Sequence, residues 1–215
     1  MTAVSLKKIL TDANKNNYAV AGLVVLAWDD ALAFTKAADE TGVPIILQAG
    51  PSCRAHTPVP ILGKMFRYLA SQTKTHVCCH IDHGYTFREC AEGIDSGFTS
   101  VMFDGSKLSL KENIKTTSKI VKKAHDAKVS VEGEIGFVGY ANGKSSEGTL
   151  PNEAVTFAKE SNVDAMAVSV GNTHLQTNKI AKIDLEKIKE IQNSISTPLV
   201  SVSYTHLTLP TIVGV

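Results

Sequence analysis

The sequence predicts an α/β fold, an incomplete TIM (β/α)8 barrel with about six and a half βα units. Short apolar runs alternate with segments of helical periodicity, which is the pattern of a parallel sheet. No glycine fingerprint of a dinucleotide fold follows the first run, whereas run after run ends in a polar or charged residue. In a barrel these strand ends converge on one face, so the barrel is preferred to a doubly wound sheet.

The expected elements follow one another without a linker. Residues 5–15 show apolar positions at helical spacing, and residues 28–42 begin with carboxylates and end in Gly42, as a helix does. Residues 109–125 begin with a capping-box pattern at Ser109 and Glu112, and residues 184–194 carry an apolar stripe. The expected strands are the runs 18–27, 43–50, 76–82, 99–105, 129–136, 164–172 and 197–200.

Composition indicates one domain with a small-molecule partner. The chain of 215 residues is 43% hydrophobic and 20% charged, with a formal charge of +1, which excludes disorder and predicts neither a nucleic-acid nor a membrane partner. No apolar run approaches the roughly 18 to 20 residues of a membrane span. The first ten residues lack the pattern of a signal peptide, so we expect a cytoplasmic protein. The four cysteines are expected to be packed thiols.

The stretch "CCHIDHG" ends an apolar run in ionisable residues. The strand period of two puts His80 and Asp82 on one face. Gly84 ends the strand, so that His83 can turn toward the same mouth. Taken alone, each imidazole also fits a hydrogen-bonded core histidine.

Three later motifs repeat this arrangement. "SVMFDGS" ends in Asp104, which alone would fit a turn aspartate, and "SVGNTH" delivers His174. "VEGEIG" places Glu132 and Glu134 on one strand face, where two buried carboxylates are costly unless paired or metal-bound. His83, Asp104, Glu134 and His174 thus offer nitrogen and oxygen donors from four strands, a set suited to zinc or a related divalent ion.

In this order the four motifs resemble those of the class II, metal-dependent ketose-bisphosphate aldolases, which include the fructose- and tagatose-bisphosphate enzymes. The resemblance runs from about residue 5 to Val200. It implies a zinc-dependent lyase of carbohydrate metabolism. Such an enzyme reversibly cleaves a ketose 1,6-bisphosphate into dihydroxyacetone phosphate and an aldehyde such as glyceraldehyde 3-phosphate.

The resemblance also implies residue roles. Asp82 corresponds to the proton donor and acceptor at the hydroxyl of the scissile carbon bond. His83 and His174 correspond to ligands of the catalytic zinc, and Asp104 and Glu134 to carboxylates of a second metal position.

Further roles concern the substrate. The glycine-rich segment 136–150 resembles the family's closing loop, whose carboxylate moves a proton at the enediolate carbon, and Glu147 is its only acid. Ser106 and Leu175 are the expected substrate-binding positions, Leu175 at the phosphate site. Besides zinc, the resemblance allows a second divalent ion and a monovalent cation, with a phosphosugar substrate and a homodimeric or homotetrameric assembly.

After Val200 the sequence departs from the family pattern. The third zinc histidine is missing from its expected place, and His206 lies outside the motif, so no role is assigned to it. We expect residues 1–200 to form a partial aldolase barrel and residues 201–215 to be a non-family tail of a truncated chain.

Three alternatives compete with a zinc aldolase. The first is a non-catalytic barrel fragment with residual metal binding, and the second is another metal-dependent phosphosugar enzyme, such as an epimerase. The third, a Schiff-base aldolase, would need a desolvated lysine at a strand end, and none of the predicted strand ends carries one.

Overall fold

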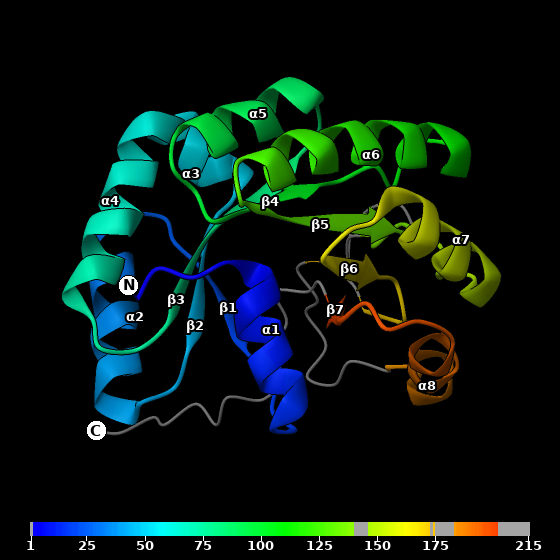
Figure 1. The fold of residues 1–215 in the computed structure, drawn as a ribbon, viewed down its shortest axis with the longest axis horizontal. Helices are drawn as coiled ribbons and strands as arrows, with labels where there is room; N and C mark the ends of the chain where they lie inside the picture. The colour runs from blue at the N-terminus through cyan, green and yellow to red at the C-terminus, as the bar shows by residue number, and fades with distance from the viewer. Residues whose placement is uncertain (1, 140–145, 173, 175–182, 202–215) are drawn as a thin grey trace.

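A curled sheet of seven parallel strands forms the centre of the molecule, with helices along its outer side (Figure 1). The computed structural model describes residues 2–139, 146–172, 174 and 183–201. Neighbouring strands pair in sequence order, so each βα unit lies beside the next. The strands confirm all seven predicted runs: β1 Ala21–Val24, β2 Ile45–Ala49, β3 Val77–Gly84, β4 Ser100–Phe103, β5 Ser130–Ile135, β6 Ala165–Val168 and β7 Leu199–Ser201.

The helices of the described residues begin and end close to where sequence signals place them. Ser109 caps its helix by accepting from the backbone N–H of Glu112, while the Glu112 carboxylate accepts from the Ser109 hydroxyl. Gly42 ends its helix with φ 70°, in the left-handed region. The helices are α1 Leu6–Lys15, α2 Trp28–Thr41, α3 Pro51–His56, α4 Val59–Gln72, α5 Phe87–Asp95, α6 Leu110–Asp126, α7 Pro151–Ser161 and α8 Leu185–Ser194.

The barrel is incomplete, as predicted. Among the described residues β1 pairs only with β2, and β7 only with β6, so the sheet curls without closing. A cavity of about 980 Å³ lies at this opening, with residues of β1 and β7 among its walls. It reaches inward to Asp82 and Glu132, so the interior of the barrel is accessible there.

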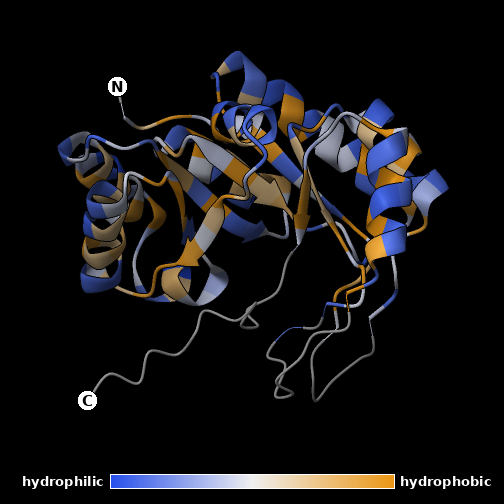
Figure 2. Ribbon diagram, turned by 90° about the horizontal axis from the view of Figure 1, so that it is seen from below, coloured by the Kyte–Doolittle hydropathy of each residue, from blue (hydrophilic) through white to orange (hydrophobic). Residues whose placement is uncertain are grey.

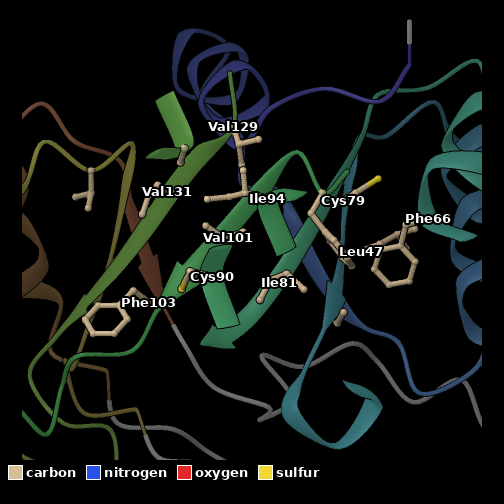
Figure 3. Packing of buried hydrophobic residues seen from close by; sticks show 14 of the residues in the cluster. Leu47, Phe66, Cys79, Ile81, Cys90, Ile94, Val101, Phe103, Val129 and Val131 are labelled. Atoms are coloured by element: carbon tan, nitrogen blue, oxygen red, sulfur yellow. The ribbon is translucent and has the colours of Figure 1, made fainter. Parts of the chain in front are cut away.

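The larger hydrophobic core lies between the sheet and the outer helices (Figure 3). Alternate strand residues, including Leu47, Ile81 and Val101, point outward into it and are fully buried. Phe66 and Phe98 meet there edge to face, with ring centroids 5.6 Å apart. This core fixes α4 and α5 against the strands that carry the polar residues.

A smaller core closes the barrel at the amino-terminal ends of the strands. Leu6 and Ile9 of α1 pack there against Ile46, Cys78 and Ala165, which point into the barrel. Cys78 and its neighbour Cys79 therefore face different cores, and all four cysteines are buried free thiols, as expected. With α1 across one end, the polar interior opens at the carboxyl ends of the strands.

The helices carry hydrophilic and hydrophobic residues side by side along their length (Figure 2). This is the pattern of helices with one face on the sheet and the other in water. Within the described ranges, every helix is too short or too polar to cross a bilayer.

Candidate active site

The end of β3 carries Asp82 and His83, and its backbone is irregular. Pairing with β4 shifts between Ile81 and Gly84. His83 has φ 107°, a conformation that costs a residue with a side chain roughly 1–3 kcal/mol. This turns the imidazole to the same mouth as Asp82, with Nε2 3.6 Å from Oδ1 of the aspartate. Gly84 ends the strand as predicted, but the backbone of His83 itself makes the turn.

His83 lies among carboxylates from two other strands. Its Nδ1 is 3.2 Å from Oδ2 of Asp104 and 3.7 Å from Oε2 of Glu134. One ligand atom from each of the three residues lies within 4.8 Å of the others. Oε2 of Glu134 is buried with no hydrogen-bond partner among the described residues, which is costly for a carboxylate unless a cation is present. The donor set and this unpartnered oxygen fit a divalent ion.

His174 lies next to this cluster. Its ring centroid is 6.1 Å from that of His83, and the two rings meet at 67°. The backbone N–H of His174 donates to the carbonyl of Gly139 over 2.7 Å, and only 5% of the residue is exposed. The structure therefore brings together all four predicted donor residues, but it groups His83 more tightly with the two carboxylates than with His174.

Burial and the neighbouring carboxylates shift the pKa values of His83 and Glu134. Burial opposes the charged imidazole, but the hydrogen bond with Asp104 and the neighbouring carboxylates raise the pKa of His83 to about 9. Burial, with the charge of Asp104, holds the pKa of Glu134 well above its usual value. In the metal-free chain a proton on His83 thus supplies the positive charge, and a bound divalent ion would displace it.

A second polar layer lies deeper in the barrel. His80 Nδ1 is 2.9 Å from the Ser100 hydroxyl, and its Nε2 is 3.5 Å from Oε2 of Glu132. Burial lowers the pKa of His80 to about 4 and raises that of Glu132 to about 8. Burial thus disfavours the charged form of both side chains. Among the described residues, Glu134 is the inward glutamate of β5 that offers an oxygen to the donor cluster.

The remaining predicted site residues lie in different settings. Ser106 donates to Oδ1 of Asp104 from its backbone N–H over 3.1 Å and from its hydroxyl over 2.6 Å. Glu147 is joined to Phe137 by two backbone hydrogen bonds just beyond β5, with its side chain on the surface, outside the donor cluster. Leu175 and His206 lie outside the described residues.

Two residues that support the site were not predicted. Arg54 of α3 donates to the backbone carbonyls of Asp82 and His83, and Asn113 of α6 donates to that of Glu134. Asn113 falls on the buried stripe of its helix, where a polar residue could have signalled a specific partner. Arg54 had no such signal, because it lies in a short segment of mixed polarity.

Imidazole and carboxylate donors suited to a metal ion gather at the carboxyl ends of parallel strands, the face on which (β/α) barrel enzymes have their active sites. The sequence matches the model of the family described as fructose-bisphosphate aldolase class-II over residues 4–203. The chain belongs to this family, and its enzyme class is that of an aldolase, a carbon–carbon lyase.

Known relatives agree with this assignment. The chain is 34% identical over 207 residues to a fructose-bisphosphate aldolase of Staphylococcus aureus, covering 93% of this chain and 72% of the relative. It is 33% identical over 202 residues to a fructose-bisphosphate aldolase of Helicobacter pylori, covering 90% of this chain and 66% of the relative.

Solved structures share the fold. The YdjI aldolase of Escherichia coli K12 superimposes with a TM-score of 0.81 at 25% identity, covering 93% of this chain and 71% of that one. The fructose-bisphosphate aldolase of Campylobacter jejuni superimposes with a TM-score of 0.72 at 23% identity, covering 89% of this chain and 65% of that one. The incomplete barrel is thus an aldolase barrel.

Proposed function

We propose that this chain is a zinc-dependent aldolase that reversibly cleaves a ketose 1,6-bisphosphate into dihydroxyacetone phosphate and glyceraldehyde 3-phosphate. The observation that carries the proposal is the cluster of His83, Asp104 and Glu134 beside Asp82 at the mouth of the barrel. The names of the relatives support fructose 1,6-bisphosphate as the first substrate to test. Residues 1–200 form the catalytic barrel in this proposal.

Asp82 is the proposed acid–base group. In cleavage its carboxylate takes the proton of the hydroxyl at C4, and the bond between C3 and C4 breaks. C4 leaves as the aldehyde carbon of glyceraldehyde 3-phosphate, and the electron pair remains on the other fragment as an enediolate. Asp82 lines the cavity of the open barrel and lies 3.6 Å from His83, which supports contact with a substrate bound there.

His83 and His174 would hold the catalytic zinc, with Asp104 and Glu134 at a second position or sharing the same ion. A divalent ion bound there supplies Lewis acidity that stabilises the negative charge of the enediolate. The contacts of Ser106 with Asp104 support a role in orienting this carboxylate, beside its proposed contact with substrate.

In cleavage a protonated Glu147 would donate a proton to C3 of the enediolate, which carries the electron pair of the broken bond, and Leu175 would line the phosphate site. The position of Glu147 just beyond β5 supports this assignment, because β5 also carries Glu134. A closing segment brings such a carboxylate to the reacting carbon only when substrate is bound.

The test uses the full chain, supplied with zinc and with fructose or tagatose 1,6-bisphosphate, and measures release of dihydroxyacetone phosphate. Asp82→Ala should lower the rate by about a hundredfold or more. Asp126→Ala, an exposed site on α6, should leave the rate unchanged. An isomerised sugar without triose phosphate would favour another phosphosugar enzyme. A folded, zinc-binding chain that leaves both sugars intact would favour a non-catalytic barrel.

A further inference from the structure

Arg54 joins the ends of two strands through its guanidinium group. It lies on α3, directly after β2, and donates to the backbone carbonyls of Ala49, Asp82 and His83, the last over 2.7 Å. The side chain is half-buried. Its partners are therefore the last residue of β2 and the two residues of β3 that carry the proposed chemistry.

The sheet leaves the end of β3 without regular support. The last β2 pair is Ala49 with Ile81, so β2 stops before Asp82 is reached. On the other side, the pairing with β4 shifts between Ile81 and Gly84. The carbonyls of Asp82 and His83 thus lie beyond one ladder and within the irregular part of the other, and Arg54 supplies donors where β2 has ended.

The geometry of these bonds is linked to the unusual backbone of His83. In a regular strand, carbonyls of consecutive residues point to opposite neighbours. Here the carbonyls of Asp82 and His83 accept from the same guanidinium, which requires the departure from strand geometry recorded by φ 107° at His83. The same departure turns the imidazole toward the donor cluster.

We infer that Arg54 is a positioning residue, whose guanidinium holds the backbone of Asp82 and His83 so that the acid–base group and the metal ligand face one site. The inference deepens the proposed function and rests on it. Arginine suits the role because its planar fork offers five N–H donors and stays charged, whereas the ammonium group of lysine is a single point charge. Lysine should therefore replace it only in part.

The first test measures metal binding by the chelator-treated full chain, using the visible absorption of added Co²⁺. Arg54→Ala should weaken Co²⁺ binding by roughly 10- to 100-fold, Arg54→Lys by less, and added guanidinium ion should partly restore Arg54→Ala. Arg67→Ala removes an exposed arginine of α4 and should bind as the unchanged chain does. In the aldolase assay kcat should fall, with KM changing by less than about twofold.

A second test needs neither metal nor activity. The imidazole proton signals of His83, assigned with His83→Gln, should shift in metal-free Arg54→Ala or Arg54→Lys and move back with guanidinium ion. If the unchanged chain bound no Co²⁺, the proposed metal centre would fail, while this spectrum would still decide the role of Arg54. Unchanged His83 signals, or wild-type Co²⁺ affinity in a folded Arg54→Ala chain, would overturn the inference. If Arg54→Ala does not fold, the Co²⁺ affinity and the His83 signals of Arg54→Lys test the inference instead.

Discussion

Asn113 on α6 donates a hydrogen bond from its side-chain amide to the backbone carbonyl of Glu134 on β5, over 2.8 Å. Only 3% of Asn113 is exposed, and its amide oxygen accepts from the hydroxyl of Thr117 over 3.0 Å. A Cβ at Gly105 would lie 2.1 Å from that oxygen, so the loop after β4 must pass close to Asn113. One buried amide thus ties a helix to the strand end that carries Glu134.

Asn113→Ala should therefore destabilise the chain. The carbonyl of Glu134 would lose its side-chain donor, at a cost of about 1–3 kcal/mol, which corresponds to roughly 2–4 °C of Tm per kcal/mol in a chain of this size. Thermal unfolding compares it with Asn152→Ala, at an exposed position of α7. Equal Tm values for the two variants would contradict the role given to this hydrogen bond.

Glu134→Gln should separate metal binding from folding. The amide keeps the shape of the side chain and removes the charge that a cation would need, so Co²⁺ affinity should fall by at least about tenfold. Folding should be retained, because burial already raises the pKa of Glu134 and disfavours its charged form. Glu160→Gln, at an exposed position of α7, is the matched control. Unaltered Co²⁺ affinity in Glu134→Gln would remove this residue from the proposed centre.

Stability of the metal-free chain should fall as the pH rises from 6.5 to 9. The carboxylates raise the pKa of His83 from 6.5 to about 9, so its stabilising charge is fully present below 6.5 and is lost through 9. Burial raises the pKa of Glu132 to about 8, and this acts in the same direction. Tm measured in chelator across this range should decline, and His83→Gln should make the decline smaller. A Tm that stays constant or rises would show that His83 is not held charged.

Gly133→Ala should destabilise the packing of α7 on β5. An added Cβ would lie 2.7 Å from the ring of Phe157, and overpacking of this kind costs about 1–3 kcal/mol. Phe157→Leu in the same chain should recover part of the loss, so the two substitutions should couple in a double-mutant cycle of unfolding free energies. Additive effects would mean that the two residues do not meet.

The seven strands could be predicted because each one is a short apolar run between helical segments, and β2 to β6 are buried almost throughout. The meeting of His83, Asp104 and Glu134 also followed from sequence, since parallel strands in a barrel bring their carboxyl ends to one face. Helix capping was predicted in part. Ser109 caps its helix, but the Glu112 carboxylate accepts from the Ser109 hydroxyl, whereas in a capping box it would accept from the Ser109 backbone N–H.

The supporting contacts could not be predicted in the same way. Arg54 binds carbonyls 28 and 29 residues further along the chain, and a backbone carbonyl carries no residue identity that a sequence motif could record. The left-handed φ of His83 could not be predicted from the sequence either, because the surrounding contacts hold it against the local preference of the residue. Sequence therefore predicted which polar residues meet at the strand ends but not the groups that hold them in place.

The most direct test of a metal-dependent aldolase is the release of triose phosphate from fructose 1,6-bisphosphate by the full chain, measured before chelation, after chelation and after zinc is added back. We predict that chelation abolishes cleavage, that zinc restores it, and that borohydride traps no covalent adduct of substrate and lysine. Cleavage that persists in chelator, or an adduct trapped by borohydride, would contradict the account.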